Sequence, residues 1–416
     1  MTGEYEQKIL PVPEELYQQP LYAISAGDAK LGLTPYPLTL GEALKMSATL
    51  AEASEADIGR AAVREALESS GISYKFLPYR LLFPPSAFQA YLGMYGQFDT
   101  DATSPVPAED VLVVKSPDNE AFSFIQRSSL WSAVIDGVSE AKLRLIQPGD
   151  VITVGGVQPC FRREVKTEVP GWRQKGFTQA DIEIAALTDE RVTPQELDTA
   201  SIRQMVQALI RTGVPKEMIQ IRLNNFMGIL YPIIGPNIPF LEKERFGWEC
   251  LDKMACAKVA INTDEYRQAQ SQAKLTLTKW QRDERVTPTA ALALQAIIEN
   301  GEYDRTFLTK LFPEESSALL ALESIAENLK NEFPAAAFSV DPLSVRGGTP
   351  GYDRTTMQAD ICTPTARFAE VAGGGAYQAA AKVSWKTLFA QDPPSNFYMV
   401  GFALGLLRIQ TALRAI

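Results

Sequence analysis

Along the first part of the chain, segments with the apolar spacing of a helix are followed by segments with the pattern of extended strands. Residues 57–68 carry apolar residues at helical spacing and predict a helix. Residues 72–85 then predict an extended segment, because two prolines end it. Residues 111–125 predict a hairpin, and residues 143–162 predict a pair of strands that turns at Pro148–Gly149.

The sequence near the middle of the chain predicts the start of a helix. Thr193–Pro194 followed by Glu196 is a capping-box signature, and the helix that it opens should end at Gly213. Residues 218–225 then predict a strand. The six letters DERVTP that contain this start occur again at residues 283–288 with different flanking sequence, so they predict two similar helix caps and no duplicated domain.

The rest of the pattern fixes the fold class that we expect. Residues 240–335 predict mostly helix, strands and glycine-rich turns follow Pro334, and residues 401–416 predict an apolar helix in which Arg408 is the most isolated charge. Helices and strands alternate without the regular βαβ rhythm of a parallel sheet. The sequence therefore predicts an α+β fold with a large antiparallel sheet flanked by helices.

The same pattern suggests a domain organisation. Residues 1–53 are rich in proline at first and then turn helical, so we expect an N-terminal arm that packs on the core or binds a partner, with packing favoured. Residues 54–416 form the main domain, and residues 240–335 form a mostly helical insertion within it.

Composition excludes several classes of function. The chain has 416 residues, 46% of them hydrophobic and 22% charged, and a net charge of −10. An acidic balance argues against broad coating of nucleic acid or anionic membrane. No apolar run is long enough to span a bilayer, and the N-terminus lacks the pattern of a secretory signal, so we expect a cytoplasmic protein. The four cysteines show no metal-binding spacing and predict buried thiols.

Histidine is absent from the whole chain. This absence excludes serine or cysteine catalysis through histidine, a zinc site of the HExxH type and a histidine pH switch. Any catalysis must rest on carboxylates, arginine, lysine, tyrosine, hydroxyl groups, a metal held by oxygen ligands, or positioning alone.

Candidate chemistry concentrates in residues 159–185, which predict a hairpin with a long charged loop. One arm carries Arg162 and Glu164, and the loop is cationic. Three polar residues alternate on the return arm and share one face, namely Gln179, Asp181 and Glu183. Arginine suits phosphate, and carboxylates suit an ammonium group or Mg²⁺. A solvated hairpin face with salt bridges would have the same composition.

This hairpin resembles motif 2 of the class II aminoacyl-tRNA synthetases, and of histidyl-tRNA synthetase in particular. That motif runs Phe-Arg-x-Glu, a variable loop, and then an aromatic residue, a glutamine and an acidic residue on the return strand. Here it reads Phe161–Arg162–Arg163–Glu164, followed by Phe177, Gln179 and Glu183.

Further segments match the same family in order over roughly residues 55–416. Gly401, Gly405 and Arg408 resemble motif 3, residues 372–378 resemble the family's Gly-Gly-Gly-Arg-Tyr strand, and Pro78 lies where motif 1 has its dimer-interface proline. Residues 221–225 and 248–255 also follow the histidyl-type pattern. The resemblance implies a class II synthetase-type catalytic core that works as a homodimer.

The resemblance also implies roles for individual residues around bound ATP and its Mg²⁺. Arg162 and Arg346 would contact the α-phosphate, Arg408 would hold the γ-phosphate, and Glu164 and Phe177 would bind adenine. Gln179 and Glu183 would take the α-ammonium group of an amino acid, and Tyr352 would line the substrate pocket. Guanidinium groups around a phosphate under attack act by positioning and electrostatics, which needs no histidine.

The sequence departs from the family at the residues that recognise histidine. The family's Leu-Arg-Pro-Glu is replaced by residues 125–128, Ile-Gln-Arg-Ser, and its Arg-Gly-Leu-Asp-Tyr-Tyr is replaced by residues 346–352. Ala376 stands where the glycine-rich strand has arginine. A site that loses polar partners of a ring discriminates against that ring, so histidine is disfavoured as substrate. The sequence ends soon after the motif 3 helix, so we expect no anticodon-binding domain and no normal tRNA charging.

Three functions fit these observations. The favoured one is an enzyme that forms an aminoacyl-adenylate from ATP and an amino acid other than histidine, and passes the acyl group to a carrier or an unusual tRNA. The second is the regulatory subunit of ATP phosphoribosyltransferase, a paralogue in this family that lacks the anticodon domain. The third is a structural pseudo-synthetase subunit.

Overall fold

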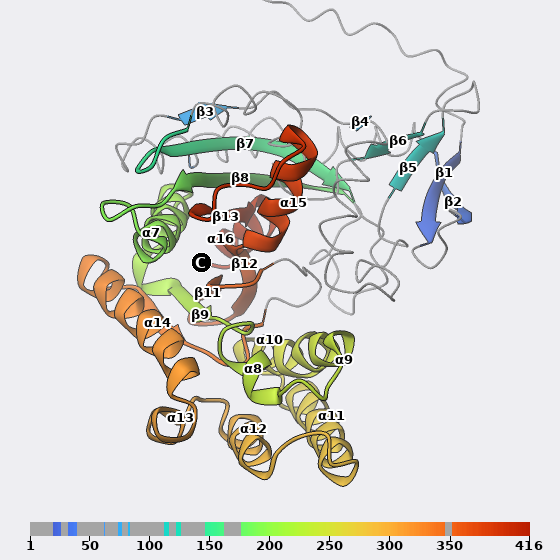
Figure 1. The fold of residues 1–416 in the computed structure, drawn as a ribbon. Helices are drawn as coiled ribbons and strands as arrows, with labels where there is room; N and C mark the ends of the chain where they lie inside the picture. The colour runs from blue at the N-terminus through green and yellow to red at the C-terminus, as the bar shows by residue number, and fades with distance from the viewer. Residues whose placement is uncertain are drawn as a thin grey trace, which may run out of the picture.

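A computed structural model of the chain describes residues 20–25, 32–39, 62, 74–76, 82–83, 112–115, 122–125, 146–161, 176–345 and 352–416. These residues contain two sheets and a large set of helices (Figure 1). No helix in the described residues is both long and apolar enough to cross a bilayer.

The central sheet has eight strands in the order β10-β9-β11-β12-β13-β8-β7-β3. Its strands in chain order are β3 (Tyr74–Phe76), β7 (Val151–Phe161), β8 (Gly176–Leu187), β9 (Ile219–Asn224), β10 (Ala337–Val340), β11 (Thr356–Cys362), β12 (Arg367–Ala376) and β13 (Phe397–Gly405). The two outermost pairs, β10 with β9 and β3 with β7, are parallel, and the other pairs are antiparallel. The predicted antiparallel sheet is therefore confirmed, with parallel strands added at both edges.

A smaller sheet of five antiparallel strands has the order β2-β1-β5-β6-β4. These strands are β1 (Pro20–Ser25), β2 (Gly32–Thr39), β4 (Leu82–Phe83), β5 (Leu112–Lys115) and β6 (Phe122–Ile125). The pairing of β5 with β6 confirms the hairpin expected at residues 111–125. Because β1 also pairs with β5, part of the expected N-terminal arm joins a sheet with later residues.

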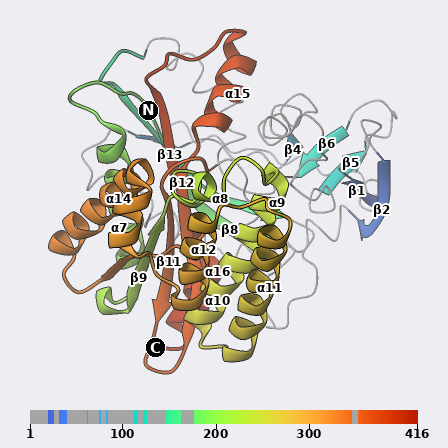
Figure 2. The same cartoon turned by 60° about the horizontal axis from the view of Figure 1, so that its bottom comes forward.

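Alternation along the central strands gives the sheet one apolar and one polar face. The apolar face carries fully buried residues such as Ile182, Ile221, Met357 and Phe402. The helices α7 (Pro194–Arg211) and α14 (Pro313–Glu332) cover this face, whereas α10 (Asp252–Ala260) lies on the other side (Figure 2). Burial of these apolar side chains is the main force that holds the layers together.

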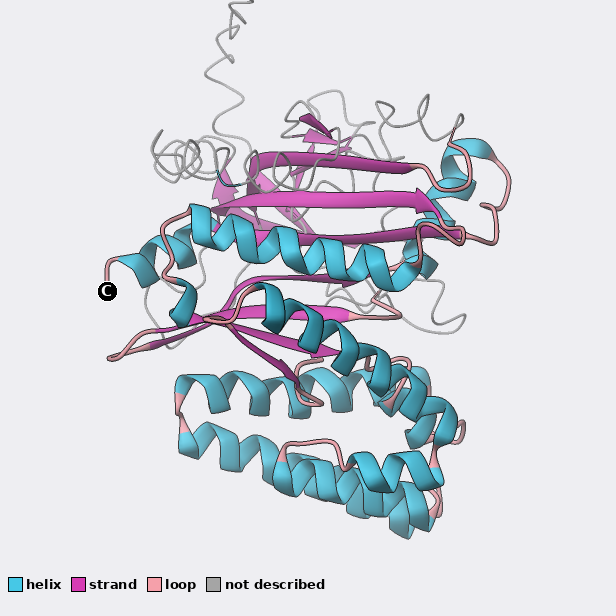
Figure 3. Ribbon diagram, turned by 90° about the vertical axis from the view of Figure 1, so that its left-hand side faces the viewer, coloured by secondary structure: helices cyan, strands magenta, loops and turns pink. Residues whose placement is uncertain are grey.

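The mostly helical structure predicted for residues 240–335 is present as a group of helices between β9 and β10. It contains α8 (Leu230–Ile234), α9 (Phe240–Arg245), a π-helical turn η3 (Phe246–Leu251), α10, α11 (Thr263–Arg282), α12 (Pro288–Asn300), α13 (Arg305–Leu311) and α14. Figure 3 shows most of these helices beneath one edge of the sheet, whereas α14 packs on β10 and β9. The interior of this group is built from apolar residues, including the buried Trp280, whose ring packs on Phe246 at 5.0 Å.

Both predicted helix caps are present. Thr193 caps α7 in a capping box with Glu196, and Thr287 caps α12 by accepting a hydrogen bond from the backbone N–H of Ala290. A proline follows each threonine and opens each helix. The repeated DERVTP segment is thus a helix-start signal that the chain uses twice.

Two details of the predicted elements are wrong. Pro148–Gly149 forms a turn, but β7 after it pairs with β8 and β3, and Ile146 and Gln147 before it are not in a strand. Residues 401–405 belong to β13, so the terminal helix α16 begins only at Leu406 and ends at Leu413. The helix expected at residues 57–68 lies outside the described residues except for Ala62, which is helical and buried.

Candidate functional site

The polar face of the central sheet carries the return arm of the predicted motif 2 hairpin. Strands β7 and β8 pair from Val151–Ala186 to Phe161–Gly176, which confirms the two arms of that hairpin. Gln179, Asp181 and Glu183 alternate along β8 and lie on one face, as predicted. Gln179 Nε2 donates to Asp181 Oδ1 at 2.9 Å, so neighbouring side chains of this row contact each other.

Glycines on the neighbouring strands leave room for Glu183. Gly401 of β13 is paired with Glu183, and a Cβ atom at Gly401 would collide with the Glu183 carboxylate. Gly375 of β12 is paired with Gly401, and a Cβ atom there would meet the ring of Tyr352. The glycines of these two strands therefore leave space for polar side chains from neighbouring segments, and the Glu183 carboxylate and the Tyr352 ring occupy it.

Glu183 is the buried end of the polar row. It is 5% exposed, and the hydroxyl of the buried Tyr377 donates a hydrogen bond to its Oε2. The ring of Tyr352 packs edge-to-face on Tyr377, with the ring centroids 6.2 Å apart. Two of the predicted substrate residues, Glu183 and Tyr352, thus both contact Tyr377, for which no role was predicted.

Burial controls the charge of Glu183. Removal from water, together with the nearby charge of Asp181 and against the hydrogen bond from Tyr377, raises the pKa of Glu183 from 4.5 to about 8. Burial and the same carboxylate raise the pKa of Tyr377, so its hydroxyl keeps the proton that it donates. A carboxyl group held in this way can accept a hydrogen bond from an ammonium or N–H group of a ligand. Such a hydrogen bond is strongest when the acceptor is buried and the donor is charged.

We expect Glu183 to make the stability of the protein depend on pH. Its pKa is higher in the folded chain than in the unfolded chain, so its contribution is complete below about pH 4.5 and is lost as the pH rises through about 8. The free energy of unfolding should therefore fall between pH 5 and pH 8.5, by up to ~1.4 kcal/mol per pH unit for each such group. Urea unfolding at several pH values measures this slope.

Matched substitutions separate Glu183 from other buried acids. Glu183→Gln should flatten part of the pH dependence, because the variant cannot ionise there. Asp198 on the opposite face of the sheet, buried and bonded to Tyr398 at 2.7 Å, has its pKa raised by burial to about 7, so Asp198→Asn should remove a separate part. An unchanged slope in Glu183→Gln would show that the carboxyl is ionised in the folded protein.

Arg408, the predicted γ-phosphate ligand, projects from α16, which packs on β8 and β12. Its Nη1 donates to the backbone carbonyl of Glu370 at 2.7 Å and lies 3.6 Å from the Glu370 carboxylate. The Arg408 side chain is 16% exposed, so its charge acts in a partly dehydrated place. This combination suits a ligand with concentrated negative charge.

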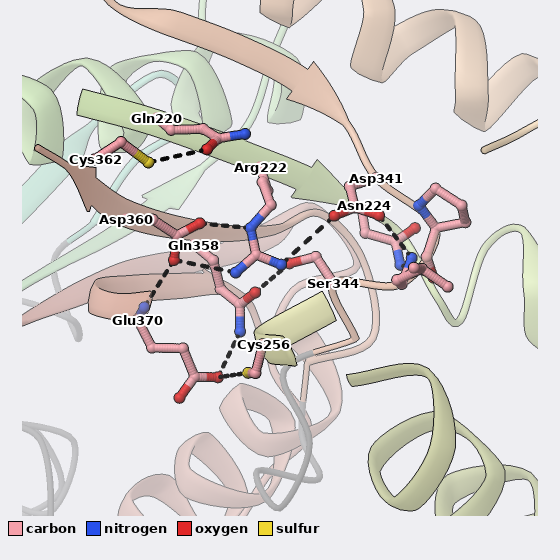
Figure 4. Close-up of polar contacts among 12 residues, drawn as sticks. Gln220, Arg222, Asn224, Cys256, Asp341, Ser344, Gln358, Asp360, Cys362 and Glu370 are labelled. Carbon is pink, nitrogen blue, oxygen red and sulfur yellow. Dashed lines mark hydrogen bonds and ion pairs between the residues drawn. The ribbon is translucent and has the colours of Figure 1, made fainter. Parts of the chain in front are cut away.

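A second polar cluster lies farther along the same face (Figure 4). Arg222 of β9 is 2% exposed and binds Asp360 of β11 with two hydrogen bonds, from Nε at 2.6 Å and from Nη2 at 3.1 Å. Its Nη1 reaches Asp341 at 3.5 Å. Burial alone would lower the pKa of Arg222, but the charges of Asp360 and Asp341 more than offset it and hold the pKa above its usual value.

One group of potential metal ligands comes together in the described part of the chain. Single ligand atoms of Asp252, Cys256 and Glu370 all lie within 4.8 Å of one another. Cys256 donates to Glu370 Oε1 at 3.6 Å, and burial with the two carboxylates raises the pKa of its thiol. The thiol in this arrangement is a hydrogen-bond donor to the Glu370 carboxylate.

The structure describes some of the predicted site residues, and their roles stay predictions. Glu183, Gln179, Tyr352 and Arg408 lie on or beside the polar face, and Phe177 lies on β8 two residues before Gln179. Arg162, Glu164 and Arg346 lie outside the described residues, as does Pro78. The sequence missed the roles of Tyr377, Arg222 and Glu370, although the alternation of Gln220, Arg222 and Asn224 between apolar residues was a signal for a polar sheet face.

Comparison with solved structures bears on the fold. An ATP phosphoribosyltransferase regulatory subunit/histidyl-tRNA synthetase from Bacillus halodurans matches with a TM-score of 0.58 at 12% identity, over 86% of this chain and 79% of that one. Histidyl-tRNA synthetase from Nostoc sp. PCC 7120 matches with a TM-score of 0.58 at 17% identity, over 88% of this chain and 72% of that one. A histidine–tRNA ligase subunit from Alicyclobacillus acidocaldarius matches with a TM-score of 0.52 at 16% identity, over 86% and 94%.

The chain has a class II synthetase-like fold. No family model matches the sequence, and no curated protein is similar to it at a significant level. At these identities the structural likeness establishes the fold alone. The class II synthetase-like fold places the predicted motif 2 return strand, the glycine-rich strand and the motif 3 strand next to each other, in the order β8, β13 and β12.

Proposed function

We propose that the chain activates an amino acid with ATP. The amino acid binds with its α-ammonium group at Gln179 and Glu183, and ATP binds along β8 toward Arg408. A carboxylate oxygen of the amino acid attacks the α-phosphorus, the bond from that phosphorus to the β-phosphate oxygen breaks, and pyrophosphate leaves. The product is an aminoacyl-adenylate.

The observation that carries this proposal is the buried row on β8. Asp181 and Glu183 are almost completely buried, and the Glu183 carboxylate occupies the space that the missing side chain of Gly401 leaves. Burying carboxyl groups away from water is costly unless a structure or a ligand compensates for it. A surface hairpin with solvated salt bridges, which the composition alone would allow, has exposed charges instead.

The remaining parts of the proposal follow from the family resemblance. Arg162 and Arg346 would contact the α-phosphate, Glu164 and Phe177 would hold the adenine, and Tyr352 would line the amino-acid pocket. ATP would enter as its Mg²⁺ complex. A second copy of this chain would complete a homodimer, and a carrier protein or an unusual tRNA would accept the acyl group.

A regulatory function is the second candidate. The Bacillus halodurans structure carries a name that includes a regulatory subunit of ATP phosphoribosyltransferase. The most complete part of the described site is the cluster of Glu183, Tyr377 and Tyr352, and a protein that senses an amino acid needs such a cluster as much as an enzyme does. In this case the amino acid would bind without ATP and without chemistry.

The experiment that separates the two is ATP–pyrophosphate exchange, with each common amino acid supplied in turn and histidine included. Exchange with one amino acid supports the enzyme and identifies its substrate. Absence of exchange with all of them argues against the enzyme. Amino-acid binding by calorimetry without ATP, and co-purification with an ATP phosphoribosyltransferase catalytic subunit, then test the regulatory function.

A further inference from the structure

Glu370 has an unusual backbone conformation. Pairing between β11 and β12 slips at this point, because Ala359 pairs with Ala372 but Ile361 pairs with Phe368, which leaves residues 369–371 opposite Asp360. Glu370 has a φ of +55° inside this bulge. The other described non-glycine residues with positive φ, at positions 261, 284 and 390, follow the ends of helices. Such a conformation in a strand is costly and persists only where the surroundings hold it.

Two groups hold the backbone of Glu370. Its N–H donates to Asp360 Oδ1 at 2.7 Å, and its carbonyl oxygen accepts from Arg408 Nη1 at 2.7 Å. Asp360 is itself fixed by the buried Arg222. The bulge therefore turns one peptide group toward Asp360 and the next toward Arg408, so that the guanidinium group is anchored to the central sheet.

The side chain of Glu370 is held as well. Its Oε1 accepts from Gln358 Nε2 at 2.9 Å, and Gln358 Oε1 in turn accepts a hydrogen bond from Ser344 Oγ. Ser344 lies two residues before Arg346. Figure 4 shows the contacts from Ser344 through Gln358 to Glu370. The contact of Glu370 with Arg408 extends this chain from the segment that leads to Arg346 as far as Arg408.

We infer that Glu370 is a positioning residue that fixes Arg408 for the distal phosphates of a nucleotide and ties it, through Gln358, to the segment leading to Arg346. This inference rests on the proposed ATP-binding function. The carbonyl and the carboxylate of Glu370 both lie near Nη1 of Arg408, at 2.7 and 3.6 Å, which restricts the rotamers of a long side chain before ligand arrives. Such preorganisation lowers the entropy lost on binding.

The test uses Glu370→Gln and Gln358→Leu in the full chain. Each variant should raise the KM for ATP in the exchange assay about tenfold, which corresponds to loss of one charge-assisted contact, and leave the KM for the amino acid unchanged. Because the two residues act through one chain of contacts, the double variant should lose no more than the worse single variant. Glu332→Gln, which breaks the exposed pair of Glu332 with Arg203 at 2.8 Å, is the matched control and should have no effect.

A second readout does not depend on ATP. In protein with ¹⁵N-labelled arginine, the side-chain signal of Arg408, identified as the one lost in Arg408→Lys, should broaden or shift in Glu370→Gln and stay unchanged in Glu332→Gln. If wild-type protein binds no ATP, the proposed function is wrong. In that case the Arg408 signal still tests the positioning role, and an unchanged signal in Glu370→Gln overturns it. If wild-type protein binds ATP but Glu370→Gln binds it equally or more tightly, only the positioning role is overturned.

Discussion

Arg408→Ala is expected to reduce ATP–pyrophosphate exchange by at least about a hundredfold, which is typical when one preorganised group that stabilises transition-state charge is removed. The Arg408 side chain is 16% exposed and its guanidinium group is anchored to the carbonyl of Glu370, so it would meet a phosphate in a partly dehydrated place. Water that fills the cavity left by alanine cannot supply a fixed positive charge. Initial rates at saturating and limiting ATP measure the loss.

Two further variants show whether charge or geometry matters. Arg408→Lys keeps the charge but loses the planar fork, so exchange should fall by only about tenfold. Arg203→Ala removes an arginine whose side chain is 36% exposed in its pair with Glu332, and exchange should be unchanged. Full exchange in Arg408→Ala would show that this residue does not contact the nucleotide, even if the protein proves to be an adenylate-forming enzyme.

The sequence predicted the fold class because local signals agreed with one another. The capping box at Thr193, the alternation along residues 176–187 and the helical spacing of residues 240–335 each depend on neighbouring residues. The start of α16 was missed because Gly401–Gly405 is apolar and short, which fits a buried strand as well as a helix. Only pairing with β8 and β12 decides between them.

The candidate site was predicted in part for a similar reason. Glu183 and Arg408 stand in motifs that can be matched along the chain, so the sequence reveals them. Asp360 and Glu370 belong to a bulge that forms only when β11 and β12 pair, and Arg222 meets Asp360 over 138 positions of sequence. Alternating polar residues predict a polar face on each strand, but they do not predict which strands become neighbours.

The buried ion pair of Arg222 and Asp360 should dominate the stability of the polar face. Arg222→Ala is expected to lower the free energy of unfolding by about 3–5 kcal/mol, because it leaves the Asp360 carboxylate buried without its partner. Asp360, which is fully buried, would retain only the hydrogen bond from the Glu370 N–H among the contacts described above. The midpoint of urea unfolding, followed by far-ultraviolet circular dichroism, measures the loss.

The double variant Arg222→Met with Asp360→Leu provides the informative comparison. Replacing both charges by apolar groups removes the unpaired charge, so this variant should be more stable than Arg222→Ala, as buried ion pairs often contribute little net stability. It also removes the acceptor that holds the Glu370 N–H, so Arg408 should lose its anchor while the fold persists. If the double variant is folded but binds ATP more weakly, the ion pair serves mainly to position the residues of the site. A double variant less stable than Arg222→Ala would instead show that the pair stabilises the sheet itself.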